Sequence, residues 1–247
     1  MHEETDDIIE LMTSHRTIRR FSPAPVPEAV IKRAVAAAQC AATSHAIQAY
    51  ALIQVTAPGE RQRLAELCGN QAQVHEAGAF FVLCVDQRRH ALVNERAGLP
   101  LATNLESFLV GVIDASLFAQ NLILACEDAG LGTCCIGGLR SDLSAVDELL
   151  ELPSGLFPIF GLCVGTPADS SSTRPRLPLA GVLFQDRYGS DAEVLAAIDA
   201  HDREAAAWYA RRGAPGRNWS ASITRLLSQA TRTELAEYYS RKGANFA

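Results

Sequence analysis

Residues 119–140 read AQNLILACEDAGLGTCCIGGLR and carry the strongest fold signals in the chain. The segment up to Ala129 ends a run from about Thr103 in which apolar side chains occur almost all the way round the predicted helix. Gly130 and Gly132 end this helix, and TCCIGG then predicts a short strand that enters a glycine pair. A helix that is apolar on nearly all sides must be buried by the core or by another subunit. The stretch therefore predicts a long buried helix followed directly by a strand.

Three further apolar runs predict strands on either side of this stretch. Residues 79–85, AFFVLCV, are continuously apolar, which is typical of a strand buried on both faces, and 50–55 and 157–164 are strand-like. Helical periodicity or stop signals predict helices at about 6–14, 27–40, 59–67 and 141–152, the last capped by Ser141, and residues 86–102 are expected to form a surface loop. Three polar-faced helices are expected over 191–211, 218–229 and 231–241. The pattern predicts an α+β fold with a core over residues 1–189 and a helical C-terminal extension over 190–247, within one structural domain.

Composition excludes several classes of partner. A formal net charge of −6 over 247 residues argues against general binding to nucleic acid or to an anionic membrane. The acidic start, MHEETDD, lacks the order of a secretory signal, and the apolar run 107–125 contains Asp114, Gln120 and Asn121, which a membrane span would resist. The seven cysteines form no CxxC pair and no metal-ligand spacing. We therefore expect a cytoplasmic protein with free thiols, no metal, no nucleic-acid partner and no membrane contact.

Residues 14–21, SHRTIRRF, concentrate positive charge in this acidic chain. Crowded guanidinium groups repel one another, so such a cluster suggests a bound anion, and a phosphate suits the planar guanidinium fork. The alternative is a solvated basic helix end, which the helix dipole favours. The stretch by itself does not decide between the two.

Common catalytic signatures are absent from the sequence. It has no GxSxG elbow, no HExxH and no Walker A loop, and GLGTCCIGG is not GxGxxG and follows a helix rather than a strand. Four scattered elements remain: SHRTIRRF, ATSHAIQ (42–48), TCCIGGLR (133–140) and GTPADSSSTRPRLP (165–178). Together they offer arginines for a phosphate, small polar side chains, and glycines that permit close backbone approach to a flat ligand.

The combination and order of these blocks resemble a known family. HRTIRRF, ATS…Q, AQNLILACEDAGLGTCCIGGLR and FGLCVGTPAD…RPRLP are similar to the oxygen-insensitive NADPH nitroreductases and flavin reductases of the nitroreductase superfamily, in their larger form, over roughly residues 6–243. The resemblance implies an FMN-dependent homodimer with flavin at the subunit interface, where the long central helix is buried. It also implies NADPH as co-substrate, with the C-terminal extension contributing to NADPH binding and to the dimer.

The resemblance assigns cofactor-binding residues by matching motif positions. It implies that the FMN phosphate and ribityl chain are surrounded by His15, Arg16, Thr17 and Arg19, and that the flavin is lined from the other subunit's side by Thr43, Ser44, Gln48 and Gln71. It also implies that the isoalloxazine ring meets the backbone of Ile136, Gly137 and Gly138, and that the phosphate is bound from a second loop by the basic pair Arg174 and Arg176. Arg174 stands where the family often has lysine, which keeps the charge but changes the hydrogen-bond geometry. Arg20 is expected to be a solvated charge outside the site.

Further positions are matched to NADPH or the acceptor. Arg212 and Arg217 match arginines expected to hold the NADPH 2′-phosphate, with a solvated loop as the alternative. His45 and Ala46 depart from the serine and bulky aromatic residue expected there, so we hypothesise a wider pocket and a changed acceptor range. Glu106 matches a carboxylate near the pocket mouth, with a helix-surface acid as the alternative.

Three functions remain open on these grounds. The first is a reductase that passes two electrons from NADPH to nitroaromatics or quinones by a ping-pong mechanism. The second is a flavin reductase with free flavin as acceptor, supplying a partner. The third is a non-catalytic flavin sensor, against which the two predicted NADPH arginines argue. No side chain is assigned as catalytic, because the flavin carries the chemistry and solvent can supply protons.

Overall fold

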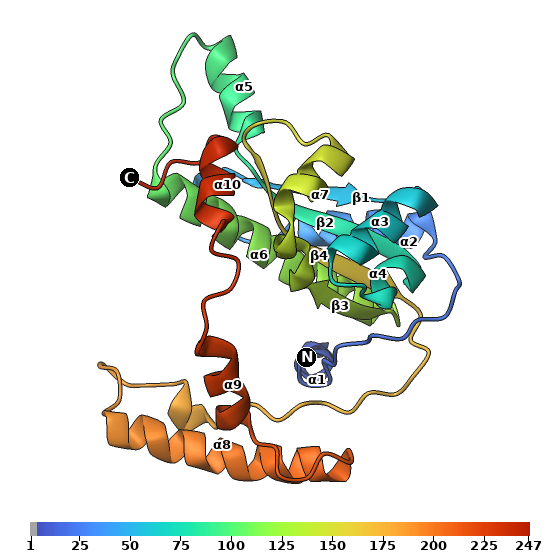
Figure 1. The fold of residues 1–247 in the computed structure, drawn as a ribbon, viewed down its shortest axis with the longest axis vertical. Helices are drawn as coiled ribbons and strands as arrows, with labels where there is room; N and C mark the ends of the chain where they lie inside the picture. The colour runs from blue at the N-terminus through green and yellow to red at the C-terminus, as the bar shows by residue number, and fades with distance from the viewer. Residues whose placement is uncertain (1–3) are drawn as a thin grey trace. The chain divides into compact units, whose positions relative to one another are not determined.

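The computed structural model describes residues 4–247, and its contacts divide the chain into two compact units. The core unit comprises the chain up to Ser171 together with Arg232–Ala247, and the second unit is Ser172–Thr231. The helices expected beyond residue 190 are therefore shared between the units. Helices α8 (Asp191–Arg211) and α9 (Trp219–Leu227) belong to the second unit, and α10 (Leu235–Arg241) belongs to the core unit (Figure 1).

A four-stranded sheet organises the core unit. Its strands are β1 (Tyr50–Gln54), β2 (Ala79–Asp86), β3 (Gly132–Ile136) and β4 (Leu156–Gly165), in the order β1-β2-β4-β3 with every neighbouring pair antiparallel. Every residue of β2 is buried. Phe81, Leu83 and Val85 join one hydrophobic cluster, and Phe80, Val82 and Cys84 join another. This alternation confirms that the apolar run is a strand buried on both faces.

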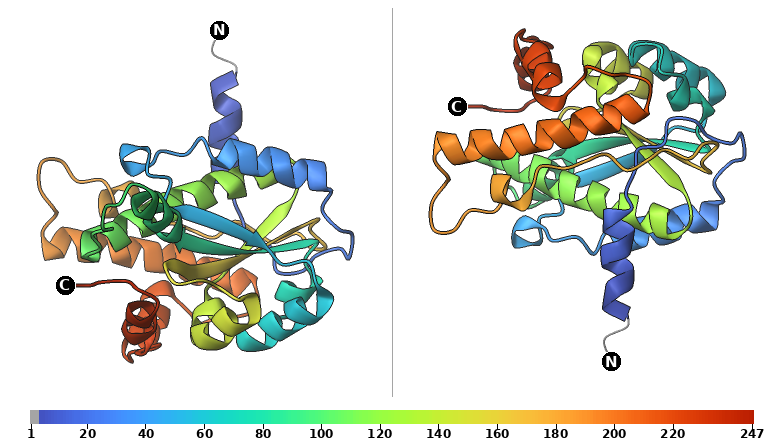
Figure 2. Two further views of the ribbon diagram at one scale, coloured as in Figure 1. Left: turned by 90° about the horizontal axis from the view of Figure 1, so that it is seen from above. Right: turned by 90° about the horizontal axis from the view of Figure 1, so that it is seen from below.

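Helices cover both faces of this sheet (Figure 2). Helices α2 (Glu28–Ala38) and α6 (Leu105–Asp128) lie on one face; α3 (Pro58–Leu67), α4 (Ala72–Glu76) and α7 (Leu143–Leu150) lie on the other. Helix α1 (Glu4–Thr13) precedes them, and short 3₁₀ turns occupy Ser44–Ala46, Gly137–Ser141 and Leu179–Gly181. The predicted α+β fold is confirmed, as are the expected helices and strands to within a few residues at their ends.

Two local predictions are wrong. The expected loop over 86–102 contains α5 (Arg88–Arg96), which buries no residue and so lacks the burial pattern that reveals a core helix. Good helix formers and the Asp86 carboxylate, which accepts from the Arg89 N–H at 2.9 Å, account for it. The cap of α7 is Asp142, whose side chain accepts from the Ala145 N–H at 3.0 Å; Ser141 instead ends the preceding 3₁₀ turn.

Helix α6 is the longest of the described helices and is capped by Asn104 at its start. It is long and apolar enough to satisfy the composition test for a membrane span. In the fold it packs against α2 and strands β1–β3 and buries the carboxylate of Asp114, as a core helix does. Its outward face carries an exposed apolar stripe at every fourth position: Leu105, Leu109, Ile113 and Leu117. Within the described residues, these four side chains remain exposed.

The C-terminal helix α10 is anchored in the core unit. Tyr238 and Tyr239 are buried in the cluster that contains α6, and the Tyr239 hydroxyl donates to the Pro158 carbonyl at 2.8 Å. Lys242 Nζ lies 2.6 Å from an Asp147 carboxylate oxygen. These contacts explain why this segment belongs with the core rather than with α8 and α9.

Candidate functional site

Residues 15–19 lie along the start of β3. Thr17 forms a parallel bridge with Thr133, and the Ile18 N–H donates to the Thr133 carbonyl at 2.9 Å. The Ile18 side chain is buried directly over Gly132, where an added Cβ would lie 2.5 Å from Ile18 Cγ1. Gly132 therefore permits the close approach that fixes this basic segment to the sheet.

The polar side chains of this segment are held in different ways. His15 Nδ1 lies 2.8 Å from Glu127 Oε1, and the Thr133 hydroxyl donates to the same oxygen at 3.1 Å. Arg16 and Arg19 are exposed, and within the described residues neither forms an ion pair. Two free cations thus lie beside an imidazole whose orientation is fixed. Such a set suits a polyvalent anion.

Two observations describe the immediate surroundings of these residues. His15 and Arg16 line a cavity of about 190 Å³ together with Glu127 and Gly132. Burial raises the pKa of the Cys134 thiol on β3, and the charge of Arg19 opposes that effect. Arg19 therefore acts electrostatically on the same strand.

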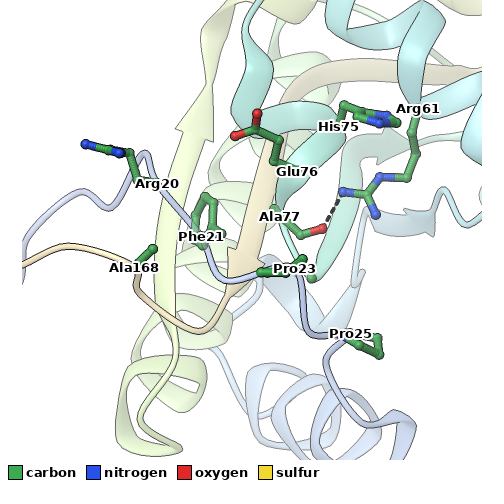
Figure 3. Close-up of a pocket in the computed structure, with 10 residues that line it drawn as sticks. Arg20, Phe21, Pro23, Pro25, Arg61, His75, Glu76, Ala77 and Ala168 are labelled. Atoms are coloured by element: carbon green, nitrogen blue, oxygen red, sulfur yellow. Dashed lines mark hydrogen bonds between the residues drawn. The ribbon is translucent and has the colours of Figure 1, made fainter.

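Arg20, the next residue along the chain, is also exposed. It lines a separate surface hollow with Arg61, His75 and Glu76 (Figure 3). Arg61 in this hollow donates to the Val74 and Ala77 carbonyls and so anchors α4. Its Nε and Nη2 groups are thus engaged in structure.

Gln71, Ile136, Gly137 and Gly138 meet at the other end of β3. The Gln71 side chain donates to the Cys68 carbonyl at 2.7 Å and lies directly against Gly138, where an added Cβ would be 2.5 Å from the Cys68 oxygen. Ile136 is fully buried, so the backbone is the part of this residue that a ligand can reach. Gly138 is therefore required by its close packing against Gln71 and Cys68, whereas an added Cβ at Gly137 would meet only Arg140 Nη2, at 3.5 Å.

The segment 43–48 is conformationally strained. His45, Ala46 and Gln48 have φ values of +48°, +56° and +52°, in the left-handed region that costs a non-glycine residue about 1–2 kcal/mol. The buried carboxylate of Asp114 on α6 holds both ends of the segment. Its Oδ1 accepts from the Ser44 N–H and its Oδ2 from the Ala49 N–H, both at 3.1 Å.

Helix α5 holds the same segment from its other side. His90 Nε2 lies 2.9 Å from the Ile47 carbonyl, and Arg89 Nη1 donates to the Gln48 carbonyl at 3.1 Å. A cavity of about 610 Å³ opens here, and the three predicted acceptor residues His45, Ala46 and Glu106 all line it. The structure therefore brings together residues that lie about sixty positions apart in the sequence.

In the second unit, three of the four predicted arginines lie on one aromatic pair, Trp208–Tyr209 of α8. The guanidinium carbon of Arg174 lies 5.4 Å from the Trp208 ring centre and that of Arg212 lies 4.8 Å from it. Arg217 lies 4.8 Å from the ring centre of Tyr209. Arg176 is exposed and forms no ion pair within the described residues.

Several residues of this arrangement were not predicted from the sequence. In the sequence, Asp114 stands out only because it is a charged residue inside an apolar helix. Trp208 stands out only as one of two tryptophans, beside an arginine-bearing loop. Glu127, which holds His15 across 112 positions, gave no local signal. Within the described residues, 15–16 and 44–46 line different cavities.

Comparison with known proteins identifies the class to which this fold and these residues belong. The Nitroreductase family model matches residues 12–166, and the model of the Nitroreductase family C-terminal domain matches residues 174–247. The chain belongs to the nitroreductase family and is an oxidoreductase. The predictions of the family, fold class and enzyme class are confirmed.

Individual relatives align over nearly the whole chain. An FMN reductase (NADPH) of Bacillus subtilis is 38% identical and covers 97% of this chain and 99% of its own length. An oxygen-insensitive NADPH nitroreductase of Salmonella typhimurium is also 38% identical, over 95% of this chain and 97% of its own. Among solved structures, a B. subtilis nitroreductase superposes with a TM-score of 0.93 at 38% identity, covering 96% and 99% of the two chains. These names agree with the expected use of FMN and NADPH.

Proposed function

We propose that this chain is an FMN-dependent oxidoreductase that takes two electrons from NADPH and delivers them, by a ping-pong mechanism, to nitroaromatics, quinones or related acceptors. The observation that carries the proposal is the pair of guanidinium groups of Arg16 and Arg19, which form no ion pair within residues 4–247 and lie beside β3 with His15. Relatives whose names specify NADPH and FMN support the cofactors.

The residues of the core unit fit a flavin nucleotide chemically. A phosphate needs cationic and neutral donors, which Arg16, Arg19, His15 and the Thr17 hydroxyl provide. A planar ring needs a backbone donor without side-chain bulk, a role that suits Gly137, where an added Cβ would meet only Arg140 Nη2 at 3.5 Å. When bound, FMN supplies the hydride- and electron-transfer chemistry.

The chain's own residues position and shield rather than react. Glu127 accepts from His15 Nδ1 and so leaves Nε2 available to a ligand. Asp114, Arg89 and His90 fix the backbone of segment 44–48, and His45, Ala46 and Glu106 shape the cavity that would receive the acceptor. The Arg16 and Arg19 charges favour negative charge on a bound group.

A homodimer accounts for the arrangement of the parts. The uncovered stripe of Leu105, Leu109, Ile113 and Leu117 is the kind of apolar surface that a second copy buries. Two copies would also allow residues 43–48 of one protomer to complete the site of its partner. We propose a cytoplasmic location, where the seven free thiols would persist.

The second candidate is a flavin reductase, in which free flavin is the acceptor at the same site. Two observations support this flavin-reductase function. The 610 Å³ cavity is open, and two relatives are named FMN reductase (NADPH) and NADPH-flavin oxidoreductase. A steady-state screen with NADPH and a panel of nitroarenes, quinones and free FMN separates the two. Turnover of nitroarenes or quinones well above that of free FMN supports the nitroarene and quinone reductase. Turnover with free FMN alone would support the flavin reductase.

A further inference from the structure

The aromatic pair Trp208–Tyr209 lies between arginines that the family pattern assigns to two different nucleotides. Arg174 is matched to the FMN phosphate and Arg212 to the NADPH 2′-phosphate, yet both lie over the same indole ring at 5.4 and 4.8 Å. A cation over an aromatic face is stabilised by the ring quadrupole within about 6 Å. One side chain thus attracts both guanidinium groups, although their like charges repel each other.

Hydrogen bonds fix the indole in this place. Trp208 Nε1 donates to the Thr173 carbonyl at 2.8 Å and to the Ser172 hydroxyl oxygen at 3.2 Å. Arg212 Nη1 donates to the same hydroxyl oxygen, also at 3.2 Å. The loop that carries Arg174 and the helix end that carries Arg212 are therefore linked through Ser172 and Trp208, all within the second unit.

The donors left over indicate the chemistry of the ligand. A hydroxyl has one donor and two acceptor sites, and the Ser172 oxygen already accepts twice, so its hydrogen remains free to donate. The hydroxyl lies beside the Arg212 guanidinium, and neither Arg212 nor Arg174 forms an ion pair within the described residues. A hydroxyl donor beside a guanidinium group is a set that a phosphate oxygen satisfies.

Tyr209 repeats the arrangement for a third arginine. Its ring lies 5.0 Å from that of Trp208 at an interplanar angle of 77°, and Arg217 lies 4.8 Å from its centre. Tyr209 reaches Arg217 but neither Arg174 nor Arg212 by this kind of contact. The two aromatic residues thus separate the arginines into different groups.

We propose that Trp208 and Tyr209 are positioning residues that set the preference for NADPH over NADH, and that Trp208, through Arg174, also sets the affinity for the FMN phosphate. This rests on the function proposed above. Removing the Trp208 ring should release Arg174 and Arg212 together, whereas removing the Tyr209 ring should release Arg217 alone. FMN binding and the choice of nicotinamide nucleotide are thereby coupled through one indole.

The test compares Trp208→Leu, Trp208→Phe and Tyr209→Leu with the wild type in the full-length protein. Calorimetry gives the dissociation constants of NADP⁺ and NAD⁺, and fluorescence titration of the cofactor-free protein gives those of FMN and riboflavin, which lacks the phosphate. For W208L we expect a roughly three- to tenfold fall in preference for NADP⁺ over NAD⁺ and a similar fall for FMN over riboflavin. W208F keeps a ring but loses the N–H donor, so its values should be intermediate.

Y209L should lower the NADP⁺ preference and leave the FMN-to-riboflavin ratio at the wild-type value. Circular dichroism and the thermal midpoint check that each variant is folded, and W208F provides a conservative replacement if W208L is not. Unchanged ratios in folded W208L or W208F, or equal loss of FMN and riboflavin affinity, would overturn the inference while leaving the proposed function intact. A wild-type protein that binds neither FMN nor NADP⁺ would overturn both.

Discussion

Replacing Asp114 tests whether helix α6 holds segment 43–48 in its strained backbone conformation. Asp114 is 1% exposed, and its two carboxylate oxygens accept from the Ser44 and Ala49 N–H groups. Hydrogen bonds to a charged group each contribute about 1.5–3 kcal/mol, so the pair contributes roughly 3–6 kcal/mol. Three left-handed residues cost roughly 3–6 kcal/mol in the opposite direction. The two effects are of the same size.

Because these terms nearly balance, losing Asp114 should release the segment before it unfolds the chain. Asp114→Asn keeps the size and one acceptor oxygen but turns an amide donor towards a backbone N–H. We expect at most about 1.5–3 kcal/mol lower stability in urea, because relief of the backbone strain offsets part of the lost hydrogen bonding, and a roughly tenfold or larger loss of kcat/KM for the acceptor. Asp114→Ala should be worse in both measurements.

The matched control is Ser116→Ala on the same helix. The Ser116 hydroxyl donates only to the Val112 carbonyl of its own helix at 2.7 Å, so its loss removes a hydrogen bond that does not reach segment 44–48. The role assigned to Asp114 would be refuted if D114N had the same free energy of unfolding as the control and a kcat/KM within twofold of the control's. A lower kcat/KM for D114N, together with exchange broadening of the NMR signals of the backbone amides of residues 44–48, would support that role.

Three other changes test separate parts of the site. Ala46→Phe should narrow the 610 Å³ cavity and shift selectivity towards smaller quinones and nitroarenes; an unchanged acceptor profile would contradict the wide-pocket hypothesis. Arg212→Glu should raise the KM for NADPH at least tenfold more than that for NADH, and equal effects would show that this arginine does not read the 2′-phosphate. Ile113→Glu places charge on the exposed stripe of α6 and should convert a dimer to monomer in sedimentation at micromolar concentration; an unchanged sedimentation coefficient would place the interface elsewhere.

The parts of the fold that were predictable are those in which local pattern decides burial. AFFVLCV has no polar position, which is typical of a strand buried on both sides, and the all-round apolar character of residues 103–129 favoured a central helix. Helix α5 was missed because it buries nothing, and propensity alone gives a weaker signal than periodicity.

The long-range partners of the site could not be predicted because no local rule encodes them. His15 was found by its motif, but its anchor Glu127 lies on another element. The hydrogen bonds from the Ser44 and Ala49 N–H groups to Asp114 depend on how α6 crosses the start of β1. The spacing of residues in the sequence does not reveal that crossing. The family pattern supplied Arg174, Arg212 and Arg217 as separate residues, and only the structure places all three on Trp208 and Tyr209.

The most direct test of the central claim is the cofactor content and nucleotide preference of the purified protein. An absorbance spectrum, followed by assays of NADPH and NADH oxidation with a nitroarene, measures both. We predict a yellow protein with the spectrum of bound FMN that oxidises NADPH faster than NADH. A colourless protein that does not bind added FMN would contradict the account.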